Sequence, residues 1–164
     1  MIKNDLHIVK WLKMSRPSFE EIYMRFAEDI SERSTCKRRS VGCCITTTDY
    51  KRVLSVGYNG NASGLKNGCD KHEAQGNCGC LHAEENAIIN CSAGPHIDKI
   101  VFSTVLPCIM CAKRIINLGG VKKVIFKHDY RKHDSMYIFE KVGIELYQTT
   151  KSGILLRCYT NDKK

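Results

Sequence analysis

From about residue 82 to residue 147, the sequence alternates between the hydrophobic patterns of helices and those of buried strands. Three segments are predicted as helices and three as short apolar strands, with Pro107 in the first turn of the second helix and glycines after the last two. In chain order they are a helix from near His82 to Ile89, a strand at Ile100–Phe102, a helix from Pro107 to Gly119, a strand at Val124–Phe126, a helix at Ser135–Val142 and a strand at Ile144–Tyr147. Strands joined by helical crossovers run parallel, with right-handed connections. This half of the chain is therefore predicted to form the parallel part of a sheet.

The first half of the chain is predicted to add one helix and a hairpin. Ser18-Phe19-Glu20-Glu21 matches a capping box and apolar residues follow at helical spacing, so a helix is expected over residues 18–33. The segments Val41–Thr47 and Val53–Val56 are separated by a short turn and are predicted to pair as a hairpin. The expected fold class is α/β, with three α/β/α layers around a mixed five-stranded sheet, which a strand at Ile154–Tyr159 would extend.

Length and composition suit one compact domain over residues 1–164, with an N-terminal extension at residues 1–16. The chain is 43% hydrophobic, which is enough for a core that needs no disulfide staples. Charged residues interrupt the apolar runs near the N-terminus, and no stretch approaches the roughly 18 apolar residues of a membrane span. We therefore expect neither a signal peptide nor a membrane partner, and the predicted location is the cytoplasm.

The formal net charge of +9 favours anionic partners. Basic residues concentrate at Lys37-Arg38-Arg39, between Lys113 and Lys132, and in the C-terminal tail. Two interpretations stay open, a solubilising surface and a small phosphate-binding patch within it. A long nucleic-acid groove is not expected, because no segment interleaves aromatic and basic residues.

The segment from Tyr58 to Cys80 is predicted to be irregular, because it is rich in Asn, Gly, Cys and charged residues and has no periodicity. An irregular segment of this length inside a small domain is unusual unless it is functional or pinned. The chain has ten cysteines, and in the absence of a secretory signal they indicate metal binding or catalysis rather than disulfides. We therefore expect metal binding by its cysteines to hold this segment in place.

Two short motifs supply candidate ligands for one metal ion, His82-Ala83-Glu84 and Pro107-Cys108-Ile109-Met110-Cys111. Cys108 and Cys111 stand three apart at a predicted helix start, so both can face one metal, and helix N-termini favour thiolates. His82 opens another predicted helix and can supply the third ligand. Three protein ligands leave tetrahedral zinc one open position, the arrangement of a catalytic site.

The pattern H-x-E followed by P-C-x-x-C is the signature of zinc-dependent nucleobase deaminases, which replace an exocyclic amino group by oxygen. In those enzymes the glutamate is the general acid and base, a role that falls here to Glu84. Residues two apart on a regular helix do not share a face, so spacing alone does not place Glu84 beside the metal. The alternative is a zinc site that only stabilises the fold, which the His-Ala-Glu motif and the proline before the first cysteine disfavour.

The chain resembles the cytidine deaminase superfamily and, within it, the deoxycytidylate (dCMP) deaminases. The resemblance covers a core at residues 18–147 and leaves a C-terminal extension at 148–164. The motifs that carry it are Arg33-Ser34-Thr35-Cys36-Lys37-Arg38, Val41-Gly42, Gly57-Tyr58-Asn59-Gly60, Gly68-Cys69-Asp70, His72-Glu73, His82-Ala83-Glu84-Glu85-Asn86-Ala87-Ile88 and Pro107-Cys108-Ile109-Met110-Cys111-Ala112-Lys113.

The resemblance implies a zinc-dependent hydrolase with the cytidine deaminase-like fold, which converts dCMP to dUMP in pyrimidine deoxynucleotide metabolism. It also implies a homo-oligomer, often a hexamer, that dCTP activates and dTTP inhibits. Substrate binding is assigned to Arg38, near the phosphate, to Asn59, at the sugar, and to Ala83 and Tyr130. Alternatives stay open: Asn59 as an ordinary Asn-Gly turn residue and Tyr130 as a side chain packed on the core edge.

Several dCMP deaminases carry a structural zinc, and the matching residues here are Cys36, Cys69, His72 and Cys78. Cys80 competes with Cys78, because the Cys-Gly-Cys spacing lets either side chain point inward. Four such ligands would make a closed tetrahedral site that ties the end of the first helix to the irregular segment. The expected cofactors are therefore one catalytic and one structural zinc, and the alternative is a set of free thiols with one surface histidine.

A second hypothesis keeps the reaction and changes the carrier of the cytosine to dCTP, cytidine, or a base in RNA or DNA. Editing of a polynucleotide would use the positive charge and requires a flipped or single-stranded base. The short chain and the irregular segment before His82 favour a small, enclosed substrate.

Overall fold

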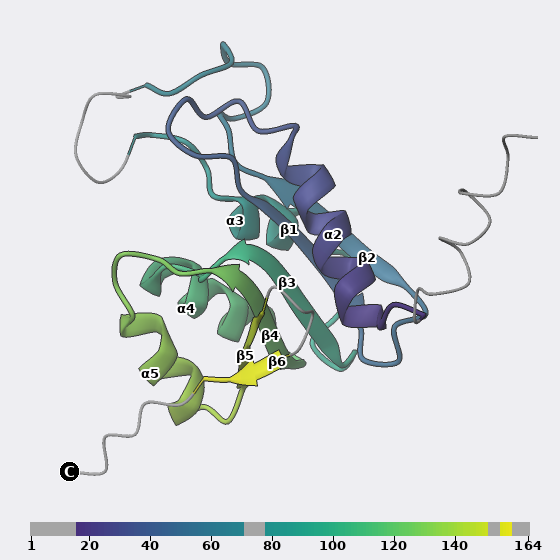
Figure 1. The fold of residues 1–164 in the computed structure, drawn as a ribbon. Helices are drawn as coiled ribbons and strands as arrows, with labels where there is room; N and C mark the ends of the chain where they lie inside the picture. Colours follow the sequence, from purple (N-terminus) through teal and green to yellow (C-terminus); the bar gives the residue numbers. More distant parts are fainter. Residues whose placement is uncertain (1–15, 71–77, 151–154, 159–164) are drawn as a thin grey trace, which may run out of the picture.

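The computed structural model describes residues 16–70, 78–150 and 155–158, and its labels follow Figure 1. The strands are β1 (Gly42–Thr47), β2 (Val53–Tyr58), β3 (Lys99–Val105), β4 (Val121–His128), β5 (Glu145–Thr149) and β6 (Leu155–Arg157). The helices are α2 (Phe19–Ser31), α3 (Ala83–Ile89), α4 (Ile109–Leu118) and α5 (Asp134–Lys141). Among the described residues, no helix is long and apolar enough to cross a membrane.

The six strands form one mixed sheet in the order β2-β1-β3-β4-β5-β6. β1 pairs antiparallel with β2 and with β3, which confirms the predicted hairpin. β3, β4 and β5 are parallel, as the alternating helices and strands predict. β6 adds antiparallel to β5, so the expected five-stranded sheet is extended by the sixth strand.

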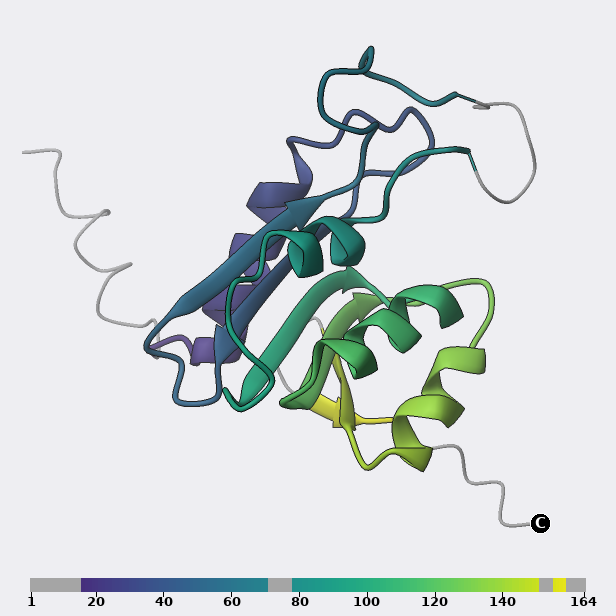
Figure 2. The same cartoon turned by 180° about the vertical axis from the view of Figure 1, so that it is seen from behind.

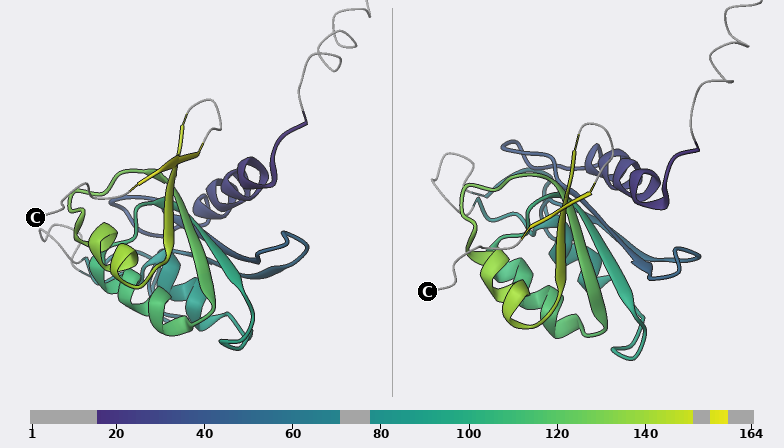
Figure 3. Two further views of the ribbon diagram at one scale, coloured as in Figure 1. Left: turned by 90° about the horizontal axis from the view of Figure 1, so that it is seen from below. Right: turned by 60° about the horizontal axis from the view of Figure 1, so that its bottom comes forward.

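The helices cover both faces of the sheet, which confirms the three-layer α/β/α architecture. Of the four described helices, α2 lies on the face toward the viewer in Figure 1, and α3, α4 and α5 lie on the opposite face, seen in Figure 2. The views in Figure 3 show the sheet between these two layers. The capping box at the start of α2 is present, because Ser18 Oγ accepts the Glu21 N–H and Glu21 Oε2 accepts the Ser18 N–H.

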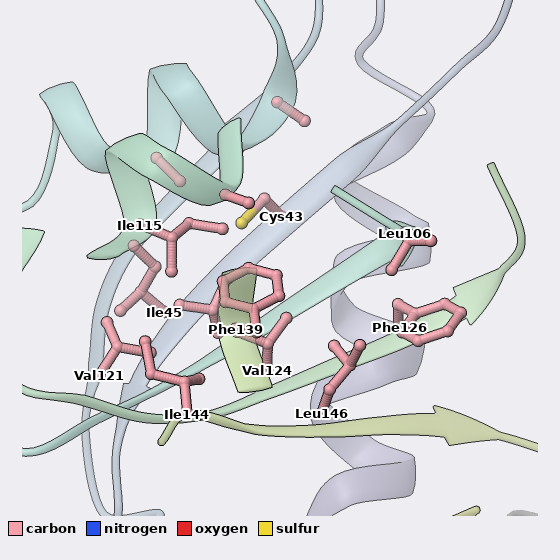
Figure 4. Close-up of a cluster of buried hydrophobic side chains, with 14 residues drawn as sticks. Cys43, Ile45, Leu106, Ile115, Val121, Val124, Phe126, Phe139, Ile144 and Leu146 are labelled. Atoms are coloured by element: carbon pink, nitrogen blue, oxygen red, sulfur yellow. The ribbon is translucent and has the colours of Figure 1, made fainter. Parts of the chain in front are cut away.

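Alternation along the strands divides the core into two parts. On the α3–α5 side, Val124 and Phe126 of β4 pack against Phe139 of α5, together with the other side chains of Figure 4. On the α2 side, Ile125 of β4 packs with Phe102. Because both faces are buried, β3 is buried along its whole length, as expected of a strand from the middle of a covered sheet.

α3 and α4 begin at neighbouring places beside the sheet. α3 can approach β2 closely because Gly57 of that strand has no side chain. A Cβ on Gly57 would lie 2.2 Å from the Ala83 carbonyl oxygen. Pro107 lies just outside α4 rather than in its first turn, because the extended residue Cys108 is the N-cap and its sulfur accepts the Cys111 N–H. Gly119 ends α4 with a positive φ of 74°.

The expected extensions fall largely outside the described residues. Residues 1–15 and 159–164 are not described, so the N-terminal extension and most of the C-terminal one stay predictions. His72 lies in the undescribed range 71–77.

Candidate functional site

The starts of α3 and α4 bring together three side chains that can hold one metal ion. His82 Nδ1 lies 3.3 Å from Cys111 Sγ and 3.6 Å from Cys108 Sγ. A nitrogen and a sulfur bound to the same tetrahedral zinc stand about 3.6 Å apart. The three predicted ligands therefore fit one zinc ion, and the three-residue set leaves the fourth position of a tetrahedron free.

Glu84 faces the same site although it is two residues from His82. The reason is that His82 is the N-cap of α3, with extended backbone angles (φ −77°, ψ 156°), so the spacing rule for regular helices does not apply to the pair. Glu84 is only 4% exposed, its Oε1 lies 3.5 Å from Ser103 Oγ, and the Cys111 side chain hydrogen-bonds to it. Burial raises the pKa of the Glu84 carboxyl, which suits a group that holds and releases a proton.

Glu85 and Arg114 fix the two ligand-bearing helix starts relative to each other. Glu85 Oε2 accepts the His82 N–H at 3.2 Å, and its other oxygen pairs with Arg114 of α4 at 3.1 Å. The sequence analysis missed both residues. The signal was present, because a glutamate three residues after an N-cap is half of a capping box even where the cap is histidine.

The two thiols at the start of α4 differ in their readiness to ionise. Hydrogen bonds lower the pKa of Cys108 to about 3. They join its Sγ to the Cys111 side chain, to the His82 ring and to the Cys111 N–H. The Cys108 sulfur raises the pKa of Cys111. A bound divalent cation would reverse the second shift, since coordinated thiols are deprotonated.

A cavity of about 290 Å³ connects this site to the irregular segments around it. Its volume is at the lower end of the roughly 300–1,000 Å³ typical of small-molecule pockets. The residues that line it include His82, Glu84 and Cys108 and three arginines, Arg38, Arg39 and Arg131. A cavity with a candidate zinc site and three guanidinium groups can hold an anionic small molecule beside the metal.

The four residues assigned to substrate binding, Arg38, Asn59, Ala83 and Tyr130, all line this cavity. Tyr130 also packs against the core, so the two interpretations of that residue are compatible. Arg39 and Arg131 line the cavity too. From the sequence, Arg39 was expected on a solvated face and Arg131 was assigned no role. The Arg131 guanidinium lies 5.7 Å from the centre of the Tyr130 ring, which places the two side chains together.

Asn59 uses its amide to hold the chain that precedes β1. Its Nδ2 donates to the Arg39 carbonyl at 2.7 Å, and its Oδ1 accepts from the Val41 N–H at 2.8 Å and from Ser34 Oγ at 2.7 Å. An amide nitrogen has a second N–H, which is the part of Asn59 left for a ligand.

A second group of sulfur atoms belongs to the segment after α2 and to the irregular segment before α3. The backbones of these two segments lie at the top of Figure 1. Cys36 Sγ is 3.5 Å from Cys69 Sγ and 3.8 Å from Cys78 Sγ, and Cys80 Sγ is 3.5 Å from Cys69 Sγ. Two sulfurs on one tetrahedral zinc stand about 3.8 Å apart. We call these four residues the four-cysteine cluster, and they fit a closed zinc site.

Cys78 and Cys80 therefore do not compete for one place, because both sulfur atoms belong to the cluster. The residue between them, Gly79, has a φ of +88°, and a Cβ there would lie 2.7 Å from an Asp70 oxygen. This left-handed conformation, which favours glycine, lets the chain turn so that both cysteines face the cluster. All ten cysteines are free thiols, so no disulfide closes either site.

Comparison with known proteins places the sequence among zinc-dependent deaminases. The model of the family described as the cytidine and deoxycytidylate deaminase zinc-binding region matches residues 17–128. The chain is 33% identical over 160 residues to ComE operon protein 2 of Bacillus subtilis, covering 92% of this chain and 81% of that protein. It is 32% identical over 148 residues to the deoxycytidylate deaminase of Schizosaccharomyces pombe, covering 81% of this chain but only 44% of that protein.

A solved structure has the same architecture over most of both chains. The dCMP deaminase of the cyanophage S-TIM5, in complex with dCMP and dUMP, superposes with a TM-score of 0.72 at 33% identity. The match covers 82% of this chain and 99% of the phage chain. The shared part therefore includes a complete small protein of this fold.

Proposed function

The chain belongs to the cytidine and deoxycytidylate deaminase zinc-binding family, and we propose that it is a zinc-dependent hydrolase that converts dCMP to dUMP with release of ammonia. The observation that carries the proposal is that one cavity is lined both by residues of the candidate zinc site, with Glu84, and by Arg38, Arg39 and Arg131. The relatives named deoxycytidylate deaminase and the phage enzyme with bound dCMP and dUMP support this substrate.

We propose that His82, Cys108 and Cys111 hold the catalytic zinc. Zinc in such a three-ligand site supplies a Lewis acid that lowers the pKa of water toward ~7. Glu84 accepts the proton of the attacking water and delivers protons to the ring nitrogen and to the amino group that leaves from C4. The raised pKa that burial gives Glu84 supports this use of one carboxyl as base and then acid.

Arg38, Arg39 and Arg131 would hold the 5′-phosphate, since a guanidinium matches phosphate geometry with paired hydrogen bonds. The second N–H of the Asn59 amide would reach the sugar. Ala83 and Tyr130 would line the part of the cavity that holds the nucleoside. Cys36, Cys69, Cys78 and Cys80 would hold the second, structural zinc. A homo-oligomer, its hexameric form, and control by dCTP and dTTP remain proposals supported by the family resemblance alone.

A substrate panel tests the proposal. The purified protein is incubated with dCMP, CMP, dCTP, cytidine and a cytosine oligonucleotide, with and without added dCTP and dTTP, while the loss of cytosine absorbance is followed. We expect dCMP to be the best substrate, because the size of the cavity and its arginines suit a mononucleotide. Activity confined to the oligonucleotide would overturn the proposal in favour of a base-editing function.

A further inference from the structure

The segment Cys36–Val41 carries two of the cavity's arginines and has no helix or strand of its own. Most of its backbone N–H groups are nevertheless hydrogen-bonded. The Lys37 N–H donates to Cys69 Sγ at 3.4 Å, and the Arg38 and Arg39 N–H groups donate to Cys36 Sγ. Sulfur atoms of the four-cysteine cluster thus accept the hydrogen bonds that a helix or strand would otherwise satisfy.

The same segment is held at its other end by Asn59. That side chain accepts the Val41 N–H and donates to the Arg39 carbonyl, and the Asn59 carbonyl accepts the Thr35 N–H at 3.2 Å. The segment is therefore held at two places, by the sulfur atoms of the four-cysteine cluster and by the side-chain amide of Asn59. Arg38 and Arg39 lie between them.

The hydrogen bonds to the cluster's sulfur atoms hold the segment only while the four cysteines stay together. Zinc deprotonates its thiol ligands and holds four sulfur atoms around one point, so the metal keeps the cluster together. Three of its members, Cys36, Cys78 and Cys80, also form part of the cavity wall. Cys69 does not line the cavity, although its sulfur accepts the Lys37 N–H.

We propose that the metal-loaded four-cysteine cluster positions the Arg38–Arg39 segment and thereby sets the preference for phosphate-bearing over phosphate-free substrates. The inference rests on the proposed function, since it takes the arginines to bind the 5′-phosphate of the nucleotide. Preorganised donors bind an anion without first being ordered, and a loose segment must be ordered at each binding event. Loss of the cluster therefore weakens contacts to the phosphate and spares those to the base.

The test replaces Cys69, because this residue holds the cluster without touching the cavity. Cys69→Ser removes one zinc ligand, and Cys69→His keeps a side chain that zinc accepts. The matched control is Cys91→Ser, a partly buried cysteine outside both metal groups. For each full-length protein, zinc per chain is measured, together with kcat/KM for dCMP and for deoxycytidine and Kd for dUMP and for deoxyuridine.

We expect Cys69→Ser to fall to one zinc per chain and to lose ~10- to 100-fold in the ratio of dCMP to deoxycytidine kcat/KM, the loss expected for one charge-assisted hydrogen bond. Its affinity for dUMP should fall by a similar factor, with little change for deoxyuridine. Cys69→His and Cys91→Ser should keep two zinc ions and the wild-type ratio. An unchanged ratio and unchanged dUMP affinity in a one-zinc Cys69→Ser protein would overturn the inference.

If Cys69→Ser does not fold, Cys69→Asp provides the test, since a carboxylate is a weaker ligand for zinc than a thiolate. The preference for dCMP and the dUMP affinity should then rise as added zinc takes the protein from one to two ions per chain. Constant values across that titration would overturn the inference. A wild-type protein that deaminates neither substrate would instead overturn the proposed function, so the two failures are distinguishable.

Discussion

Asn59 shows how a single side chain can decide the shape of a site without taking part in the chemistry. The sequence left open whether it is a turn residue or a ligand of the sugar. In the structure, its amide bonds to Ser34, Arg39 and Val41 and is only 7% exposed. Neither interpretation included this role, because the partners are 18 to 25 residues away in the chain.

Replacing Asn59 by aspartate should destabilise the fold. A carboxylate cannot donate to the Arg39 carbonyl and places a negative charge against it, so we expect the free energy of unfolding to fall by ~1–3 kcal/mol. Urea denaturation measures the change. The same substitution at the exposed Asn67 is the control and should stay within ~0.5 kcal/mol of wild type. Equal effects at both positions would contradict the account.

Among the helices and strands, the close packing of α3 on the sheet decides where His82 and Glu84 lie. Sequence patterns predicted each helix and strand because their apolar periodicity is strong, and they predicted that His82 and Cys108 stand at helix starts. They did not show that His82 is an extended N-cap, nor that Gly57 is the point of contact. Both facts depend on packing between segments distant in sequence, which periodicity does not encode.

Gly57→Ala should lower activity through α3. The added Cβ would lie 2.2 Å from the Ala83 carbonyl oxygen and 2.3 Å from the Ala87 nitrogen, so the helix that orients His82 and Glu84 must move. We expect a stability loss of ~1–3 kcal/mol and a fall in kcat of up to ~100-fold, since small displacements of reacting groups are costly.

Gly42→Ala is the matched control, because its Cβ would lie 1.9 Å from the Ala27 carbonyl oxygen of α2, on the opposite face of the sheet. It should destabilise the protein to a similar degree, as thermal denaturation would report, with a smaller effect on kcat. A fall in kcat as large as that of Gly57→Ala would show that activity follows general stability instead of the position of α3.

At the scale of the whole molecule, the sheet places two metal-binding groups and one cavity at neighbouring positions. The spacing of His82, Cys108 and Cys111 was enough to predict one three-ligand zinc site, whereas the second site, at Cys36, Cys69, His72 and Cys78, came from the resemblance to dCMP deaminases. Cys80 was expected only as the alternative to Cys78, and the structure brings both into the cluster through the φ of +88° at Gly79. His72 lies outside the described residues, so its part in the site stays a prediction. The sequence did not place Arg39 and Arg131 in the cavity wall, because a basic residue in a chain of net charge +9 carries little information by itself.

In the proposed reaction, Glu84 moves the protons of a zinc-dependent deamination of dCMP. The most direct test is the rate of ammonia and dUMP formation from dCMP by wild-type protein and by Glu84→Gln, at equal measured zinc content. We expect the variant to keep its zinc and its affinity for dUMP while kcat falls by ~10²- to 10⁴-fold, the usual contribution of general acid–base catalysis. A Glu84→Gln protein that retains zinc and turns over dCMP at nearly the wild-type rate would contradict it.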